Sequence, residues 1–238
     1  MYKVDLHSHT IASGHALNTV FELVDEAGRK GIEILGITEH GPAVRGAPPP
    51  SYFCMFQRYP HMINGVRVLY GIEANVIDEQ GKLDLSDNLL EKQDIVLAGL
   101  HPTTEFSGKS KEANTKALIA AAKKPYVKII THPYSTHFDV DIEELAEAAC
   151  DNDTLLEINC SYFLKSLDNR EDTFDKMKRM IAAVKKRGKK LVVNSDAHCV
   201  SELGREDELK DAFQELGLEE KDIINNDIEE VKRFLGID

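Results

Sequence analysis

Histidine is the residue type through which this chain could do chemistry. His7 and His9 lie two residues apart at the end of a short apolar run, and Asp196 and His198 repeat that spacing after the last such run. Side chains two residues apart in a strand point to the same side, so both members of a pair can reach one ion. Imidazole and carboxylate groups are common ligands of catalytic zinc. The spacing therefore predicts a metal centre built from both ends of the chain.

Residues of the same types end the apolar runs between these two pairs. They are His40, Glu73, His101 and His132, and His15 lies in the loop after the first run. Because the chain has only nine histidines, we interpret this series as metal ligands rather than as chance. Glu39 adjoins His40 and should face the opposite way, as a hydrogen-bonded or ion-paired support. His61 and His137 fall outside the pattern and are expected at the surface.

The number of candidate ligands indicates more than one ion. Seven histidines and two carboxylates are too many for one site, since catalytic zinc keeps about three protein ligands and an open position. If Glu73 bridges two ions, ten ligand contacts divide into groups of four, three and three. We therefore expect three divalent cations. The imidazole-rich set favours Zn²⁺, with Mn²⁺ and Fe²⁺ as alternatives that ligand chemistry does not separate.

These residues need a frame that brings the ends of seven apolar runs together. The runs cover 2–7, 32–40, 66–73, 94–101, 127–132, 154–159 and 190–196, and they have the near-continuous apolar character of buried parallel strands. Helical periodicity occupies Thr19–Lys30, Ser110–Lys123, Asp141–Ala149 and Asp172–Arg187, with Gly31 and Gly188 after two of them. This alternation predicts a single α/β domain over 1–238, a β/α barrel of seven strands. In an open doubly wound sheet, ligands from all seven strand ends would not converge.

Two further regions differ from the strand–helix rhythm. Gly41–Pro60 holds five of the eight prolines and four aromatic residues, so we expect a long loop over the mouth of the barrel. This loop is either a lid or a packed surface loop without a function. Residues 201–238 hold thirteen acidic and five basic residues and are expected to form an acidic helical region.

Composition excludes several classes of protein. The net charge of −12 disfavours nucleic acid as a main partner, because binding its backbone requires Lys and Arg to replace counterions. No run approaches the length of a membrane span, and the first residues lack a signal-peptide pattern. The four cysteines show no CxxC spacing, which indicates reduced thiols. We therefore expect a cytoplasmic protein without a membrane partner; a homo-oligomer stays open.

The motifs as a set resemble the PHP (polymerase and histidinol phosphatase) domain family, in particular its bacterial YcdX-type zinc phosphatase branch. They are Asp5-Leu6-His7-Ser8-His9-Thr10, Thr38-Glu39-His40, Gly71-Ile72-Glu73-Ala74-Asn75, Gly99-Leu100-His101, Thr131-His132-Pro133, Leu156-Glu157-Ile158-Asn159 and Ser195-Asp196-Ala197-His198. The resemblance runs from residue 1 to about 199. It implies a distorted (β/α)7 TIM-like barrel, three zinc ions and phosphoesterase activity. It also implies three ligand sets, namely His7, His9, Glu73 and Asp196; His15, His40 and His198; and Glu73, His101 and His132.

The charge of such a centre favours hydrolysis of small phosphate monoesters. Three divalent ions with two carboxylates leave a positive pocket that attracts a phosphoryl group, and a hydroxide bridging two ions is the expected nucleophile. Asp5, Asn75 and Asn159 are candidates for supporting hydrogen bonds, and Arg45 and Arg170 for binding phosphate.

Three alternative functions remain at this stage. A metal-dependent amidohydrolase also uses an HxH motif, but it typically has a bridging lysine at the fourth strand and a histidine after the sixth. This chain has His101 and Asn159 at those two positions. A histidinol phosphatase would be expected to carry extra substrate-binding insertions. A non-catalytic metal-binding module would bind zinc without turning over any phosphate ester.

Overall fold

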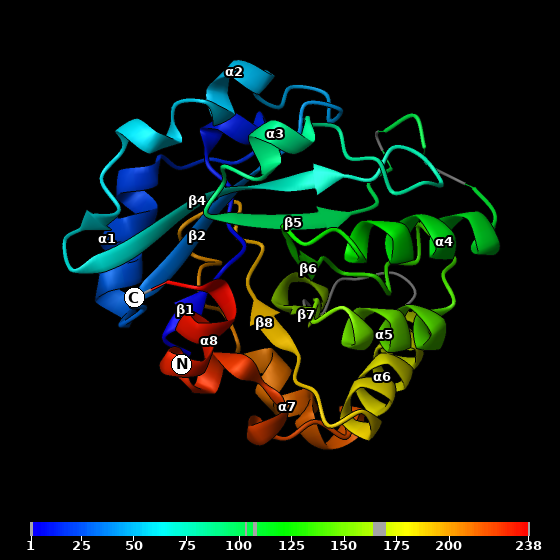
Figure 1. Ribbon diagram of the computed structural model, residues 1–238. Helices are drawn as coiled ribbons and strands as arrows, with labels where there is room; N and C mark the ends of the chain where they lie inside the picture. The colour runs from blue at the N-terminus through cyan, green and yellow to red at the C-terminus, as the bar shows by residue number, and fades with distance from the viewer. Residues whose placement is uncertain (1, 103, 107–108, 164–169, 238) are drawn as a thin grey trace.

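Seven parallel strands form a nearly closed barrel in the computed structural model, which describes residues 2–102, 104–106, 109–163 and 170–237 (Figure 1). In barrel order they are β1 (Val4–Asp5), β2 (Ile34–His40), β4 (Val66–Asn75), β5 (Ile95–Gly99), β6 (Val127–Ile130), β7 (Leu155–Asn159) and β8 (Val192–Asn194). A short eighth strand, β3 (Met62–Ile63), runs antiparallel to β4 outside this path. The predicted seven-stranded barrel is confirmed, although β1 is shorter than the run 2–7 that predicted it.

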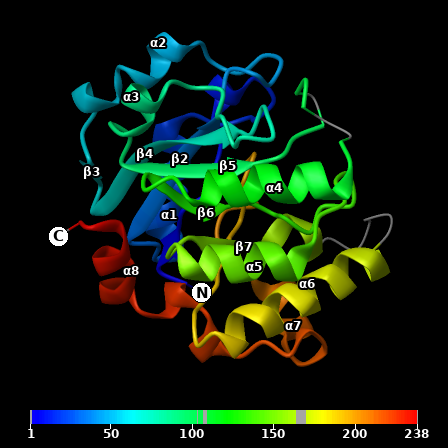
Figure 2. The same ribbon diagram turned by 45° about the vertical axis from the view of Figure 1, so that its right-hand side comes forward.

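Helices cover the outside of the barrel. The four predicted ones are α1 (Val20–Lys30), α4 (Lys111–Ala122), α5 (Ile142–Asp151) and α6 (Arg170–Lys186), and α4 to α7 (Asp207–Leu216) follow one another along one flank (Figure 2). Three shorter helices, α2 (Pro50–Phe53), α3 (Asp87–Leu90) and α8 (Ile228–Leu235), complete the set in the described part of the chain. The Thr19 side chain caps α1, and Gly31, at φ 74°, ends it in the left-handed conformation that glycine adopts without strain.

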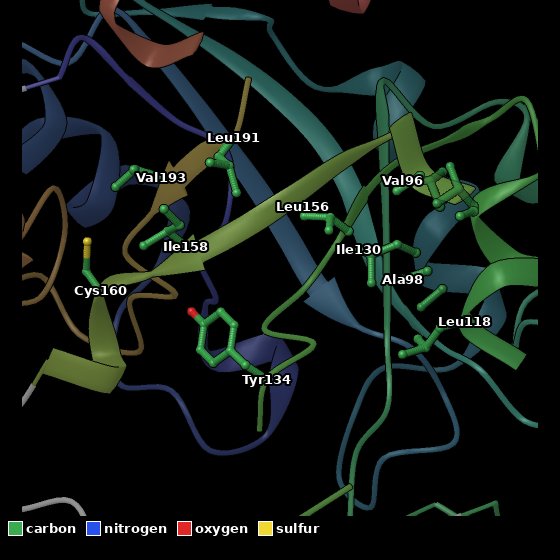
Figure 3. Close-up of a cluster of buried hydrophobic side chains, with 14 of the residues drawn as sticks. Val96, Ala98, Leu118, Ile130, Tyr134, Leu156, Ile158, Cys160, Leu191 and Val193 are labelled. Atoms are coloured by element: carbon green, nitrogen blue, oxygen red, sulfur yellow. The ribbon is translucent and has the colours of Figure 1, made fainter. Parts of the chain in front are cut away.

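The barrel wall separates two apolar clusters. Val96, Ala98, Ile130, Leu156 and Ile158 face outward and pack under the helices (Figure 3). The interior cluster holds alternate residues of the same strands, with Ile224 and Val231 closing the lower end of the barrel; its strand members are Val4, Leu6, Ile34, Leu69, Ile95, Leu97, Ile129, Leu155 and Val192. Because side chains alternate along a strand, His40, Glu73 and His101, which lie an even number of residues after Ile34, Leu69 and Leu97, also face the interior, now at the rim.

Glycine makes room where the interior narrows below the rim. Gly71 lies between Leu69 and Glu73 on the interior face of β4, and a Cβ there would lie 2.0 Å from the carbonyl oxygen of Ile95. Gly99 has the same position on β5, where a Cβ would lie 2.3 Å from Thr131 Oγ1. The missing side chains allow β4, β5 and β6 to approach closely beneath the ligand residues that follow them.

The proline-rich segment 41–60 has two different halves. Its second half contains α2 and a 3₁₀ turn, Phe56–Arg58, and it buries Phe53 and Phe56 against the outer wall. The Phe56 ring stacks on Tyr70 of β4 with 5.4 Å between centroids. This half is therefore packed surface structure rather than a lid. Closure by the first half, 41–49, stays a prediction.

The acidic C-terminal region meets the start of the chain. The Tyr2 backbone N–H donates to Glu206 at 2.9 Å, and the Tyr2 hydroxyl donates to Glu220 at 3.0 Å. Figure 1 shows α8 beside β1, close to β8. The helices in this region are α7 and α8, joined by 3₁₀ turns at Glu220–Asp222 and Ile224–Asn226. No helix within the described ranges has the length and apolarity needed to cross a membrane.

Candidate metal centre

The first cluster joins both ends of the chain at the barrel mouth. His7 Nε2 lies 3.0 Å from His9 Nε2, and His9 Nε2 lies 3.1 Å from Asp196 Oδ1. Glu73 Oε2 approaches the same point, 3.3 Å from His7 Nε2. Both imidazoles and the Glu73 carboxyl group are fully buried. The structure thus brings together the four residues of the first predicted ligand set.

The second cluster consists of three imidazoles. His15 Nε2 lies 3.2 Å from His40 Nε2 and 3.1 Å from His198 Nε2. His15 stacks on both rings with centroid separations of 4.9 and 4.8 Å. His40 also places Nδ1 2.9 Å from Glu73 Oε2, so this cluster adjoins the first.

The third cluster lies on the other side of Glu73. Its Oε1 is 3.1 Å from His101 Nε2 and 3.1 Å from His132 Nε2. The two carboxylate oxygens of Glu73 therefore face different clusters, Oε2 the first and Oε1 the third. This is the geometry that a carboxylate needs to bind two cations, and an imidazole with one free nitrogen cannot replace it.

The donor atoms fit divalent cations. Ligands at zinc distances in a tetrahedral site are separated by about 3.3 Å, close to the separations in all three clusters. The buried oxygens Glu73 Oε2 and Asp196 Oδ1 have no hydrogen-bond donor among the described residues. An unpaired buried carboxylate oxygen is costly, and a cation between it and the facing nitrogens removes that cost.

Burial and neighbouring charges shift the pKa values of the cluster histidines in opposite directions. Burial opposes charge on His7, but Glu157, Glu73 and Asp196 outweigh it and raise its pKa well above the usual value. Burial, with the neighbouring His40, lowers the pKa of His9 well below its usual value. Burial also lowers the pKa of His40 to about 4. Neutral rings with free nitrogens are the form in which histidine binds metals.

Two carboxylates behind the first strand orient its histidines. His7 Nδ1 lies 2.8 Å from Glu157 Oε1, which also accepts from Asn194 Nδ2. His9 Nδ1 lies 3.0 Å from Ser13 Oγ, and that hydroxyl donates to Glu39 at 2.6 Å. Such partners fix the ring orientation and leave Nε2 free to act as a ligand. The predicted supporting role of Glu39 agrees with this geometry.

Glu157 is the residue whose role the sequence reasoning missed, although it lies within one of the quoted motifs. It is fully buried on β7 and also accepts from the His132 backbone N–H at 3.0 Å. One signal in the sequence was available. Glu157 lies two residues after the interior Leu155 and two residues before Asn159, so strand alternation turns this charged side chain toward the interior. A buried charge needs partners, so this position pointed to the site.

The other predicted supports divide into two groups. Asn159 Nδ2 donates to Asp196 Oδ2 at 2.9 Å and so holds one cluster residue directly. Asp5 accepts from the backbone N–H groups of Ser195 and Gly204, and Asn75 donates to Asp84. Asp5 also accepts from the His7 backbone N–H at 3.4 Å, so it holds backbone next to the first cluster, whereas Asn75 fixes a loop.

The remaining candidates are exposed or have side chains outside the described part of the chain. Arg45 is exposed on the first half of segment 41–60. Arg170 begins α6, but its side chain lies outside the part that the structure describes. His61 is half-exposed and lies 3.3 Å from Asp94, and His137 is exposed, as expected for both.

A cavity of about 240 Å³ adjoins the first two clusters. Asp196 and His198 form part of its wall, and its other lining residues are Cys160, Ser161, Ser195, Glu202 and Arg205. Arg205 is the cation of this cavity, held by Glu208 through Nε at 3.0 Å. The sequence reasoning missed it because it treated 201–238 as an acidic region.

Relatives of known sequence match nearly the whole chain. A probable phosphatase of Caldanaerobacter subterraneus is 41% identical over 233 residues, covering 98% of this chain and 90% of the relative. A probable phosphatase of Citrobacter koseri is 38% identical, covering 99% of this chain and 94% of the relative. This chain belongs to the PHP-type phosphatase family. The resemblance noted in the sequence is confirmed.

Two solved structures share the fold of this PHP-type chain at low identity. Histidinol phosphate phosphatase from Lactococcus lactis, complexed with zinc, L-histidinol and phosphate, matches with a TM-score of 0.62 at 18% identity, covering 92% of this chain and 95% of that one. Archaeal ribonuclease P with mature tRNA matches with a TM-score of 0.60 at 14% identity, covering 98% and 90%. A family model for RNase P subunit p30 matches residues 4–228 and describes a related barrel family. The likenesses to the two solved structures show the barrel alone.

Proposed function

We propose that this PHP-type phosphatase is a metal-dependent phosphoesterase that hydrolyses small phosphate monoesters. It uses three divalent cations, and Zn²⁺ is the favoured metal. The observation that carries the proposal is the position of Glu73. Its oxygens face the first and third clusters within about 3.3 Å of their nitrogens, and His40 links it to the second cluster. A structural zinc site needs one closed ligand set, whereas three adjoining open sets suit catalysis.

The chain holds and orients the centre. The proposed ligands are His7, His9, His15, His40, Glu73, His101, His132, Asp196 and His198. When bound, divalent cations supply a water of lowered pKa as nucleophile and positive charge for the phosphoryl oxygens. Glu157 keeps the ring of His7 turned so that Nε2 faces the mouth, and Ser13 with Glu39 does the same for His9.

Charge favours a phosphorylated substrate. Only two of the nine proposed ligands are carboxylates, so the ligand set compensates a small part of the charge of three divalent cations. The mouth then attracts anions although the chain as a whole carries −12. The adjoining 240 Å³ cavity favours a small substrate, with Arg205 as a candidate contact beside the predicted Arg45 and Arg170.

The alternatives receive less support. The relatives are named as probable phosphatases, which disfavours an amidohydrolase or a non-catalytic module. L-histidinol and phosphate are bound by a neighbour that shares only the fold, so histidinol phosphate is one substrate to test rather than the proposed one.

The test combines metal analysis with a substrate panel. Purified protein should hydrolyse at least one phosphomonoester, lose that activity with a strong chelator, and regain it with Zn²⁺ or Mn²⁺. The panel should include histidinol phosphate and phosphodiesters. Activity that survives complete metal removal, checked by elemental analysis, would contradict the metal-dependent mechanism. Bound zinc without turnover of any phosphate ester would favour the non-catalytic module.

A further inference from the structure

The barrel closes between β1 and β8 in an unusual way. Neighbouring strands elsewhere in the barrel share a backbone ladder. Among the described residues, β1 and β8 meet through one isolated bridge, Ser8 with Ala197, at the rim. We call the stretch below it, Val4–Leu6 facing Val193–Ser195, the seam. Backbone groups along the seam must find other partners.

A side chain from the acidic C-terminal region fills the lower part of the seam. Asn225 Nδ2 donates to the Val4 carbonyl at 2.9 Å and to the Val193 carbonyl at 2.7 Å. Its Oδ1 accepts from the Val193 N–H at 2.8 Å. Asn225 is 2% exposed, and its carboxamide takes the place of a peptide group between the two strands.

Asn225 is itself held firmly. The Leu191 N–H donates to the Asp222 carbonyl at 2.9 Å, and the Ile224 N–H donates to the Leu191 carbonyl at 2.9 Å. The segment 222–225 therefore runs as a short extension beside the start of β8. The Asn225 side chain that it carries is, among the described residues, one of three that bridge the seam, since Asn194 Oδ1 accepts from the Leu6 N–H and Asp5 Oδ1 accepts from the Ser195 N–H.

The seam lies below two of the three clusters. β1 leads to His7 and His9, and β8 leads to Asp196 and His198, so the 3.1 Å contact between His9 and Asp196 spans it. The His15–His198 contact spans it as well. The third cluster draws on β4, β5 and β6 and does not cross the seam.

We propose that Asn225 is a positioning residue that sets the width of the seam and thereby the cation affinity of the first and second clusters. The proposal rests on the proposed function, since it assumes that these clusters bind cations. Asn225 contacts no proposed ligand, so it acts through the strands alone. It gives the C-terminal region a role in the centre at the opposite end of the barrel.

The test compares Asn225→Leu with Asn114→Leu. Asn114 is a matched control, because it is fully buried and its Nδ2 donates to two carbonyls, Lys109 and Asp139, far from the seam. Zinc affinity is measured by competition with a coloured chelator, and zinc per folded chain by elemental analysis. In Asn225→Leu we expect two of three zinc ions to bind about tenfold or more weakly and the third to bind as in the parent. Asn114→Leu should keep parental affinity at all three sites despite a lower Tm.

Parental zinc affinities in folded Asn225→Leu would overturn the inference, and so would an equal loss at all three sites. If Asn225→Leu is recovered unfolded, Asn225→Ser is measured in its place under the same criteria. A parent chain that takes up no zinc would overturn the proposed function and the inference together. Parental binding in the variant would overturn the inference alone.

Discussion

The pairing of β2 with β4 and the seam between β1 and β8 hold ligand residues by different means. Between β2 and β4, seven consecutive residues pair, from Ile34 with Arg67 to His40 with Glu73. The backbone ladder alone therefore places His40 beside Glu73. At the seam, the side chains of Asn225, Asn194 and Asp5 supply the links. Positions on the ladder follow from strand periodicity, whereas positions at the seam depend on residues remote in sequence.

The largest expected effect is on the ladder side. Glu73→Gln keeps the shape of the side chain but removes its charge and one good donor oxygen. We expect it to lose about two of three metal ions and to lower kcat by about 1000-fold, with less effect on stability. Metal content per folded chain and steady-state kinetics measure this. Parental metal content in the variant would show that Glu73 is not a bridge.

A smaller loss is expected at the second cluster. His15 lies beyond the 3₁₀ turn Ile11–Ser13, in the long loop after β1, and it touches His40 and His198 but not Glu73. His15→Ala should therefore lose about one metal ion and leave the other two in place. Elemental analysis of His15→Ala and Glu73→Gln, each as metal ions per folded chain, compares the two losses. Equal losses in the two variants would contradict the division into three clusters.

Replacing the supporting carboxylate Glu157 should weaken metal binding at the first cluster without abolishing it. Glu157→Gln keeps the volume but weakens the hold on His7 Nδ1, so we expect metal affinity at the first cluster to fall 10- to 100-fold. Saturating zinc should restore most of the activity, unlike in Glu73→Gln. Exposed Glu143, paired with Arg179 on the outside, provides the control Glu143→Gln. Unchanged zinc affinity in Glu157→Gln would limit that residue to a packing role.

The smallest effect is expected outside both regions, at Arg45. If segment 41–49 closes over substrate, Arg45→Ala should raise KM for small phosphates by a fewfold and change kcat less, the sign of lost uniform binding. Steady-state kinetics with one phosphomonoester measure the changes in KM and in kcat separately. Unchanged KM and kcat would assign Arg45 to the surface.

The sequence predicted the residues whose positions follow from periodicity. His40, Glu73 and His101 lie an even number of residues after the interior Ile34, Leu69 and Leu97, so the strand pattern alone aims them into the mouth. The barrel itself follows from the same alternation, because seven buried strands must share one core.

His132 shows where periodicity stops. It follows the outward-facing Ile130 by two residues, which by alternation would turn it away from the mouth. A backbone φ of 29° at His132 redirects it toward Glu73, and Asp196 also has a positive φ, 53°. Strained backbone at a non-glycine residue persists only where surrounding contacts fix it, and those contacts are tertiary. Arg205 and Asn225 were missed for the same reason, since nothing local marks their contacts.

Anomalous diffraction at the zinc edge from zinc-loaded crystals tests the central claim most directly. We expect three peaks in the barrel mouth, two of them next to the separate oxygens of Glu73 and the third among His15, His40 and His198. A single peak, or peaks that leave Glu73 without contact, would contradict the three-cation centre.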